Sequence, residues 1–68
     1  MWKFDTMLAK RGIKVLLQTK DQLVIQTTKL IDTMFYIQPF GWHLDNIQPD
    51  DFKVNGKKVE RNILYYYK

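Results

Sequence analysis

A chain of 68 residues, 46% hydrophobic and 26% charged, has the composition of one small globular domain. The absence of cysteine excludes disulfides and thiolate metal sites, and the single histidine, His43, cannot build a zinc site alone, so we expect no metal and no cofactor. The formal net charge is +4, and no apolar run approaches the roughly 20 residues that span a bilayer. Since the sequence also lacks the features of a signal peptide, we expect a soluble, intracellularly made protein. Because so small a core gives marginal stability, we expect it to associate with a partner.

Charge is unevenly distributed along the sequence. Residues 1–29 carry six basic and two acidic side chains, residues 30–52 four acidic and no basic ones, and residues 53–68 five basic and one acidic, which gives blocks of +4, −4 and +4. Opposite blocks suit a contact between identical copies in which one patch meets a different patch and the contact closes into a ring. If the blocks interleave in space, the pattern has no such meaning.

The first predicted element is a short helix that ends at Gly12. Asp5 supplies an N-cap acceptor, the last turn is basic, and glycine favours the left-handed conformation that often closes a helix. Phe4 before the cap can pack on Ala9 as a hydrophobic staple. A helix this short needs tertiary support, and we expect it to lie over the end of a sheet.

A β-hairpin is predicted next. Residues 13–19 and 22–28 alternate apolar and polar side chains over most of their length, and Lys20-Asp21 lies between them as the turn. The side chains expected to face inward are Val15, Leu17, Leu23 and Ile25.

A third strand and a long loop follow. Thr33–Gln38 is rich in apolar and aromatic residues, and Pro39 ends the predicted strand because proline cannot donate to a ladder. From Phe40 to Asp51 the periodicity disappears and turn-forming residues are frequent. A loop of about a dozen residues is long for a compact domain, and such loops are often functional.

The strongest local signal is Asn55-Gly56, which lies between alternating apolar and basic residues and predicts a tight hairpin. Its return strand runs through Val59 into Asn62–Tyr67. Five strands, one short N-terminal helix and no second core predict a single all-β, mainly antiparallel domain over residues 1–68, built as a small barrel or sandwich.

No pattern predicts catalysis. The chain has neither serine nor cysteine, so the commonest hydroxyl and thiol nucleophiles are missing. The adjacent carboxylates Asp50 and Asp51 are typical of a solvated turn, and a loop histidine such as His43 usually packs or forms hydrogen bonds. We therefore expect no enzyme and no catalytic residue. Trp42 is either an exposed interface anchor or a plug at one open end of the barrel.

The C-terminal strand offers an alternative function. Small basic barrels bind single-stranded nucleic acid by stacking bases on aromatic rings while cations follow the phosphates. The residues that would do so here are Tyr65, Tyr67, Lys57, Lys58, Arg61 and Lys68. The simpler interpretation is that a strand favours tyrosine, with Tyr65 and Tyr67 on one face and Tyr66 on the other. The acidic middle block also weakens a nucleic-acid surface.

Several short motifs, taken in order, resemble one family. They are Ala9-Lys10-Arg11-Gly12, the strand Ile13–Gln18, the aromatic segment ending in Ile37-Gln38-Pro39, the loop after it, and Gly56-Lys57-Lys58-Val59 leading to Leu64-Tyr65. Over residues 7–68 this order is similar to the small head–tail joining and connector proteins of tailed bacteriophages. The resemblance implies a small β-barrel in the virion, made in the host cytoplasm, that forms a ring between portal and tail around the channel that DNA crosses.

The resemblance also bears on role and interface. Family members often carry a long insertion between early strands, and Thr19–Gln22 leaves no room for one, so an adaptor or other minor virion role fits better than a channel plug. The expected interface residues are Trp42, Asp50, Asp51, Lys57, Lys58 and Arg61. The basic residues among them either line the channel or meet the two aspartates of a neighbouring copy.

Three functional hypotheses result. The leading one is a structural assembly protein of the phage connector or tail, a homo-oligomer or part of a larger assembly, acting through protein contacts without catalysis. The second is a small basic β-barrel that binds nucleic acid. The third is a phage inhibitor that binds a host enzyme through the loop over residues 40–51. None of them involves a membrane.

Overall fold

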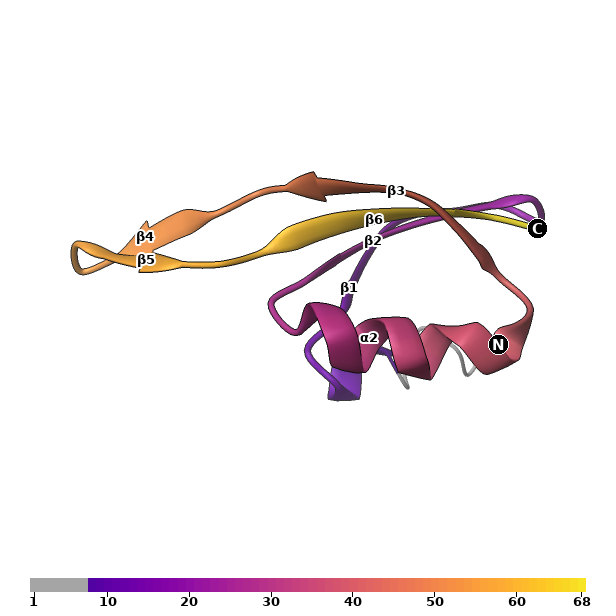
Figure 1. Cartoon of the computed structure of the whole chain (residues 1–68), viewed down its shortest axis with the longest axis horizontal. Helices are drawn as coiled ribbons and strands as arrows, with labels where there is room; N and C mark the ends of the chain where they lie inside the picture. The colour runs from indigo at the N-terminus through magenta and orange to yellow at the C-terminus, as the bar shows by residue number, and fades with distance from the viewer. Residues whose placement is uncertain (1–7) are drawn as a thin grey trace.

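Residues 8–68 are described by the computed structural model, in which a curved antiparallel sheet carries a helix on one face and a hairpin that projects beyond it (Figure 1). In chain order the elements are β1 (Lys14–Gln18), β2 (Gln22–Thr27), α2 (Leu30–Ile37), the 3-10 turn η1 (Gln38–Phe40), β3 (His43–Pro49), β4 (Phe52–Val54), β5 (Lys57–Val59) and β6 (Asn62–Tyr67). Among these residues the main sheet has the order β1-β2-β6-β3, and β4 pairs with β5 alone. The fold is thus mostly antiparallel β-structure with a short helix.

The predicted hairpin of β1 and β2 is confirmed, with one correction. Leu23 and Ile25 are fully buried and Val15 is half-buried, as expected. Leu17, however, is 46% exposed, because the register of β1 shifts between Val15 and Leu17. Leu16 is the extra residue of this bulge, and one extra residue turns every later side chain of a strand to the opposite face.

The predicted third strand is wrong: the segment from Leu30 to Ile37 is helix α2, and η1 continues it. Thr33 and Ile37 are buried against the sheet while Leu30 and Met34 are half-buried, which is the i, i+3, i+4, i+7 spacing of a helix. In so short an apolar run the helical and extended periods are hard to distinguish by sequence.

The predicted loop is also wrong, because most of it forms β3. This strand pairs with β6 and is one edge of the sheet. A register shift between Leu44 and Asn46 makes Asp45 an extra residue, which breaks the alternation that would mark a strand. Pro49 is tolerated at the end of an edge strand, where a missing N–H disturbs no central ladder.

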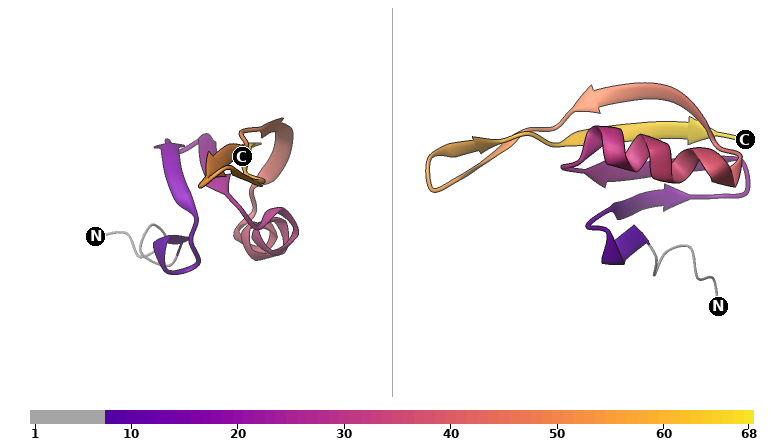
Figure 2. Two further views of the ribbon diagram at one scale, coloured as in Figure 1. Left: turned by 90° about the vertical axis from the view of Figure 1, so that its left-hand side faces the viewer. Right: turned by 60° about the horizontal axis from the view of Figure 1, so that its bottom comes forward.

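The Asn55-Gly56 hairpin is confirmed. Asn55 has a φ of 52° and Gly56 a φ of 82°, the positive pair that a two-residue type I′ turn requires. Together β4 and β5 form an arm, which we define as residues 52–59. Figure 1 and the right-hand view of Figure 2 show the arm extending past the main sheet, away from α2. Its return strand does not run unbroken into β6, because Glu60 and Arg61 separate them.

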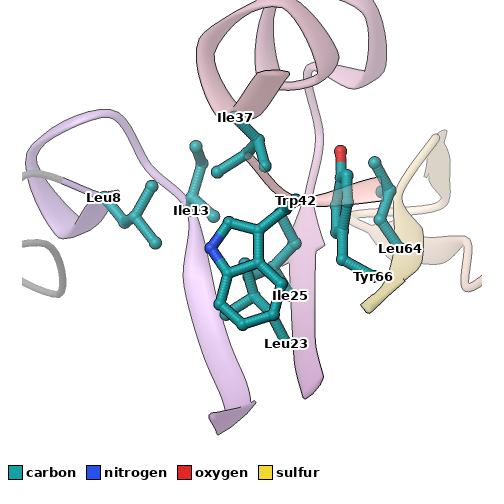
Figure 3. Close-up of a cluster of buried hydrophobic side chains, with 8 residues drawn as sticks. All are labelled: Leu8, Ile13, Leu23, Ile25, Ile37, Trp42, Leu64 and Tyr66. Atoms are coloured by element: carbon teal, nitrogen blue, oxygen red, sulfur yellow. The ribbon is translucent and has the colours of Figure 1, made fainter. Parts of the chain in front are cut away.

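The core lies between the sheet and the helices. Its fully or nearly fully buried hydrophobic side chains within residues 8–68 are Leu8, Ile13, Leu23, Ile25, Ile37, Trp42, Leu64 and Tyr66 (Figure 3). The two sheets do not close into a barrel, so the expected barrel or sandwich is not confirmed, and the main sheet has a covered and an uncovered face.

The N-terminal prediction is only partly within the described residues. Residues 8–10 are helical, and Gly12 has a φ of 77°, the left-handed conformation expected at the end of a helix. The cap at Asp5 and the staple at Phe4 lie outside the described residues. Leu8 is fully buried, so this helix end packs into the core.

Candidate protein-interaction site

An apolar groove lies between α2 and the end of the sheet where β3 begins and β6 finishes. It encloses about 520 Å³. Its walls are formed by Ile31, Met34, Phe35, Gln38, Trp42, His43, Leu44, Tyr66 and Tyr67. A volume of this size is typical of pockets that hold a ligand or a few side chains of a partner.

Two large apolar side chains on α2 stand at this groove and remain in solvent. Phe35 is 69% exposed and Ile31 is 59% exposed, and they are one helical turn apart. The helix already buries its opposite stripe through Thr33 and Ile37. An eight-residue helix that is apolar on two sides contacts the core with one side and leaves the other exposed, which is typical of an interaction surface.

Trp42 forms part of the inner wall of the groove, and only 6% of it is exposed. The Nζ of Lys68 lies 4.6 Å from the ring centroid and donates a hydrogen bond of 3.1 Å to the carbonyl oxygen of Phe40. Gly41 makes this corner possible with a φ of 83°. Trp42 is therefore a core residue in this structure, and the exposed loop expected of an enzyme inhibitor is absent, because residues 43–49 are a strand.

A buried hydroxyl lies beside Trp42. Tyr66 is 5% exposed, and Figure 3 shows its hydroxyl on the helix side of the core. Within the described residues this hydroxyl has no hydrogen-bond partner, and the hydroxyl of Tyr36 has none either. Loss of hydration raises the pKa of Tyr66 to about 12, because burial penalises the charged phenolate.

The charged residues expected to contact a neighbour pair within one copy instead. Arg61 Nε lies 2.9 Å from Asp50 Oδ2, and Lys58 Nζ lies 3.3 Å from Asp51 Oδ2. The backbone N–H of Arg61 and then the Lys58 ammonium hold the pKa of Asp51 below 3.8. These contacts join β3, the arm and β6, so they fix the base of the arm. Lys57 has no carboxylate partner in the described part of the chain.

The uncovered face of the sheet carries the tyrosines singled out from the sequence. Tyr65 and Tyr67 point to this face while Tyr66 points into the core, which is the predicted alternation. Tyr65 donates a 2.7 Å hydrogen bond to Gln48 Oε1, and the ring centroid of Tyr67 lies 5.4 Å from that of His43. The basic residues do not gather here, because Lys57 and Lys58 lie on the arm.

The outer edge of β3 is poorly suited to pairing with another strand. The N–H of Ile47 donates to the side-chain oxygen of its neighbour Asn46 at 2.9 Å, and Pro49 has no N–H to offer. The bulge at Asp45 interrupts the edge further. These are devices by which proteins prevent edge-to-edge association of sheets.

No protein family, curated protein or solved structure was found to match the chain. Within residues 8–68 no three metal-ligating side chains come together, and no helix there is long and apolar enough to cross a membrane. Ile31 and Phe35 were missed as site residues by sequence reasoning. Their signal is present, since they lie four residues apart and outside the buried stripe, but it can be recognised only once the segment is known to be helical.

Proposed function

We propose that this protein is a structural assembly protein that acts through protein–protein contacts at the groove between α2 and β3. The observation that carries the proposal is the exposure of Phe35 and Ile31 beside an apolar groove of about 520 Å³. Exposed apolar side chains gathered at a concave site mark interaction surfaces, whereas isolated ones need no explanation. Aromatic residues are also the type that dominates interface energies.

The small core supports the same conclusion. A domain of this length buries only about 60% of its unfolded surface, and here no disulfide adds stability. Burial of the groove in an assembly removes more apolar surface from water. Stability then rises with concentration, because a partner that binds only the folded state shifts the folding equilibrium.

A place in the head–tail connector or tail of a phage is the biological setting that the sequence resemblance suggests, and it is part of the proposal. One element of that expectation needs revision. Asp50 and Asp51 are paired with Arg61 and Lys58 of the same copy, so these charges are less available to join neighbouring copies. The contact is therefore proposed at apolar side chains, with charge in a secondary role.

The test is sedimentation velocity of the full chain from about 1 µM to about 1 mM, with the melting temperature measured at each concentration. We expect the average mass and the melting temperature to rise together. Phe35→Glu should weaken association by about 1–2 kcal/mol or more, because roughly two-thirds of a phenylalanine side chain is still available for burial and full burial contributes about 1.5–3 kcal/mol.

Leu17→Glu is the matched control. Leu17 is also an exposed apolar residue, but it lies on β1, outside the groove. It should leave association unchanged. A monomer with a concentration-independent melting temperature over the whole range contradicts the proposal.

Nucleic-acid binding is a second candidate, and the position of the tyrosines favours it. Tyr65 and Tyr67 lie on the uncovered face of β6, a central strand of the sheet, with His43 beside Tyr67. Aromatic rings on an open sheet are a common platform on which unpaired bases stack. The basic side chains that would contact the phosphates lie on the arm and at the opposite end of the sheet. The face that carries Tyr65 and Tyr67 is therefore not flanked by a continuous positively charged surface.

Electrophoretic mobility of a labelled single-stranded oligonucleotide at low salt tests this candidate. Binding should weaken with salt, and Tyr67→Ala should cost about 1–3 kcal/mol if a base stacks there. Lys29→Ala, which removes a charge and no aromatic ring, is the control. Absence of a shift at low salt eliminates nucleic-acid binding and leaves the assembly proposal unaffected.

A further inference from the structure

The arm has the properties of a segment that binds another molecule. It projects beyond the main sheet, and an isolated two-stranded hairpin is marginally stable at best in water. It is held at its base, where Arg61 packs with its Cζ 4.3 Å from the ring centroid of Phe52 and pairs with Asp50. Lys58 of β5 also pairs with Asp51, while Val54, next to the turn, is 48% exposed.

One side of the arm is apolar with a basic border. The register pairs Phe52 with Val59 and Val54 with Lys57, and residues that pair directly across two strands share a face. This face therefore carries three apolar side chains and one ammonium group. Lys53 and Lys57 have no carboxylate partner within residues 8–68.

The arm and the groove lie at opposite ends of the molecule. The longest extent of the Cα trace is 38 Å, and Figure 1 shows the arm at one end of it. The groove includes His43 and Tyr67, which pair where β3 begins and β6 ends, at the other end. An arm cannot reach the groove of its own copy, whereas it points away from the body in the direction of a neighbour.

We propose that the arm of one copy inserts its Phe52–Val54 face into the α2/β3 groove of the next copy. The inference rests on the proposed assembly function and names the partner as a second copy of this chain. The apolar side of the arm matches the apolar wall formed by Ile31, Phe35 and Leu44. Asp45, next to Leu44 and without an ion-pair partner in the described residues, supplies a carboxylate for Lys57, the lysine on the inserted face of the arm.

Such a contact is heterologous, because each copy uses its arm on one side and its groove on the other. Repetition gives a closed ring where the rotation between copies closes and a filament where it does not. Both edges of the main sheet are interrupted by bulges, at Leu16 and at Asp45, so arm insertion joins copies without requiring a continuous intermolecular sheet.

The decisive experiment mixes two variants of the full chain. Val54→Glu damages the arm and keeps the groove, while Phe35→Glu damages the groove and keeps the arm. Each alone should associate at least about tenfold more weakly than the original chain. Mixed in equal amounts, they should form a one-to-one dimer that grows no further, because one intact arm meets one intact groove. Native mass spectrometry of an isotope-labelled mixture reads out the composition.

A charge exchange provides a second test that does not touch the core. Lys57→Glu should weaken association, and mixing it with Asp45→Lys should restore part of it. Leu17→Glu is again the control, and circular dichroism verifies that each variant folds.

The outcomes separate the inference from the function on which it rests. If Phe35→Glu prevents association and Val54→Glu does not, the groove binds another protein segment, so the inference is wrong and the assembly function stands. If the original chain remains monomeric and its groove takes up only a small apolar dye, both are wrong. A mixture of the two variants that forms no dimer, although both are folded, also overturns the inference.

Discussion

Replacing Tyr66 by phenylalanine should stabilise this protein. Tyr66 is 5% exposed, and its hydroxyl has no hydrogen-bond partner among the described residues. The substitution removes the oxygen and keeps the ring that packs with Trp42 and Leu64 in the core. Because the hydroxyl forms no hydrogen bond among these residues, its removal breaks none and eliminates the free-energy cost of burying the hydroxyl away from water.

The size of the effect follows from that cost. A buried polar group without a partner costs about 1–3 kcal/mol. For a domain of roughly 60–100 residues, 1 kcal/mol shifts the melting temperature by about 4–8 °C. We therefore expect Tyr66→Phe to raise the melting temperature at neutral pH by at least about 4 °C.

The pH dependence gives an independent signature. Burial raises the pKa of Tyr66 from 10.0 to about 12, so the folded state retains the phenolic proton where the unfolded state loses it. The stability that Tyr66 contributes is fully present below its pKa in the unfolded chain. It is lost as the pH rises through its pKa in the folded protein. Between about pH 10 and pH 12 the original chain should lose up to about 2–3 kcal/mol more than Tyr66→Phe.

Urea unfolding of both proteins at neutral and alkaline pH measures these quantities. Tyr67→Phe is the control, since Tyr67 is 49% exposed. It should leave the free energy of unfolding at neutral pH unchanged. If Tyr66→Phe is less stable than the original chain by more than about 1 kcal/mol, the hydroxyl has a favourable partner and the reasoning is wrong.

Two further predictions concern particular polar contacts. Thr33→Val should cost about 0.5–1.5 kcal/mol in urea unfolding, because the buried 2.8 Å hydrogen bond between the hydroxyls of Thr33 and Thr27 is lost while Thr27 Oγ1 still accepts from the backbone N–H of Lys29; an unchanged midpoint would contradict this. Asp51→Asn should flatten the acid side of the stability curve. The backbone N–H of Arg61 and then the Lys58 ammonium lower the pKa of Asp51 from 3.8. The stabilisation from Asp51 is therefore present above its pKa in the unfolded chain and is lost as the pH falls through its pKa in the folded protein. Parallel loss of stability in acid for both proteins would refute this.

The sequence correctly predicted those features whose conformation depends on residues that are close together in the chain. Asn55-Gly56 adopts the positive φ pair of a tight turn, and Gly12 closes the N-terminal helix, because few other residues adopt these conformations at low cost. The alternation in β2 correctly predicted the burial of Leu23 and Ile25. The alternation of the tyrosines of β6 between the two faces of the sheet was predicted for the same reason, because successive residues of a strand point to opposite faces.

Elements that depend on distant contacts were mispredicted. Leu30–Ile37 forms a helix because, as a helix, it buries the apolar face of the sheet. Its short apolar run is compatible with both the helical and the extended periodicity. His43–Pro49 became a strand because β6 offered it a partner, although a bulge at Asp45 had hidden the alternation. The site depended on both elements, so Ile31 and Phe35 could not be recognised beforehand.

By itself, the amino-acid sequence determined the Asn55-Gly56 turn, the buried face of β2 and a mainly antiparallel β-structure. Only the tertiary structure decided that the sheet stays open, that Trp42 lies inside and that Asp50 and Asp51 pair within the copy. The physical reason is the range of the forces involved. Backbone sterics act between adjacent residues, whereas burial and ion pairing depend on which distant segments the finished fold brings together.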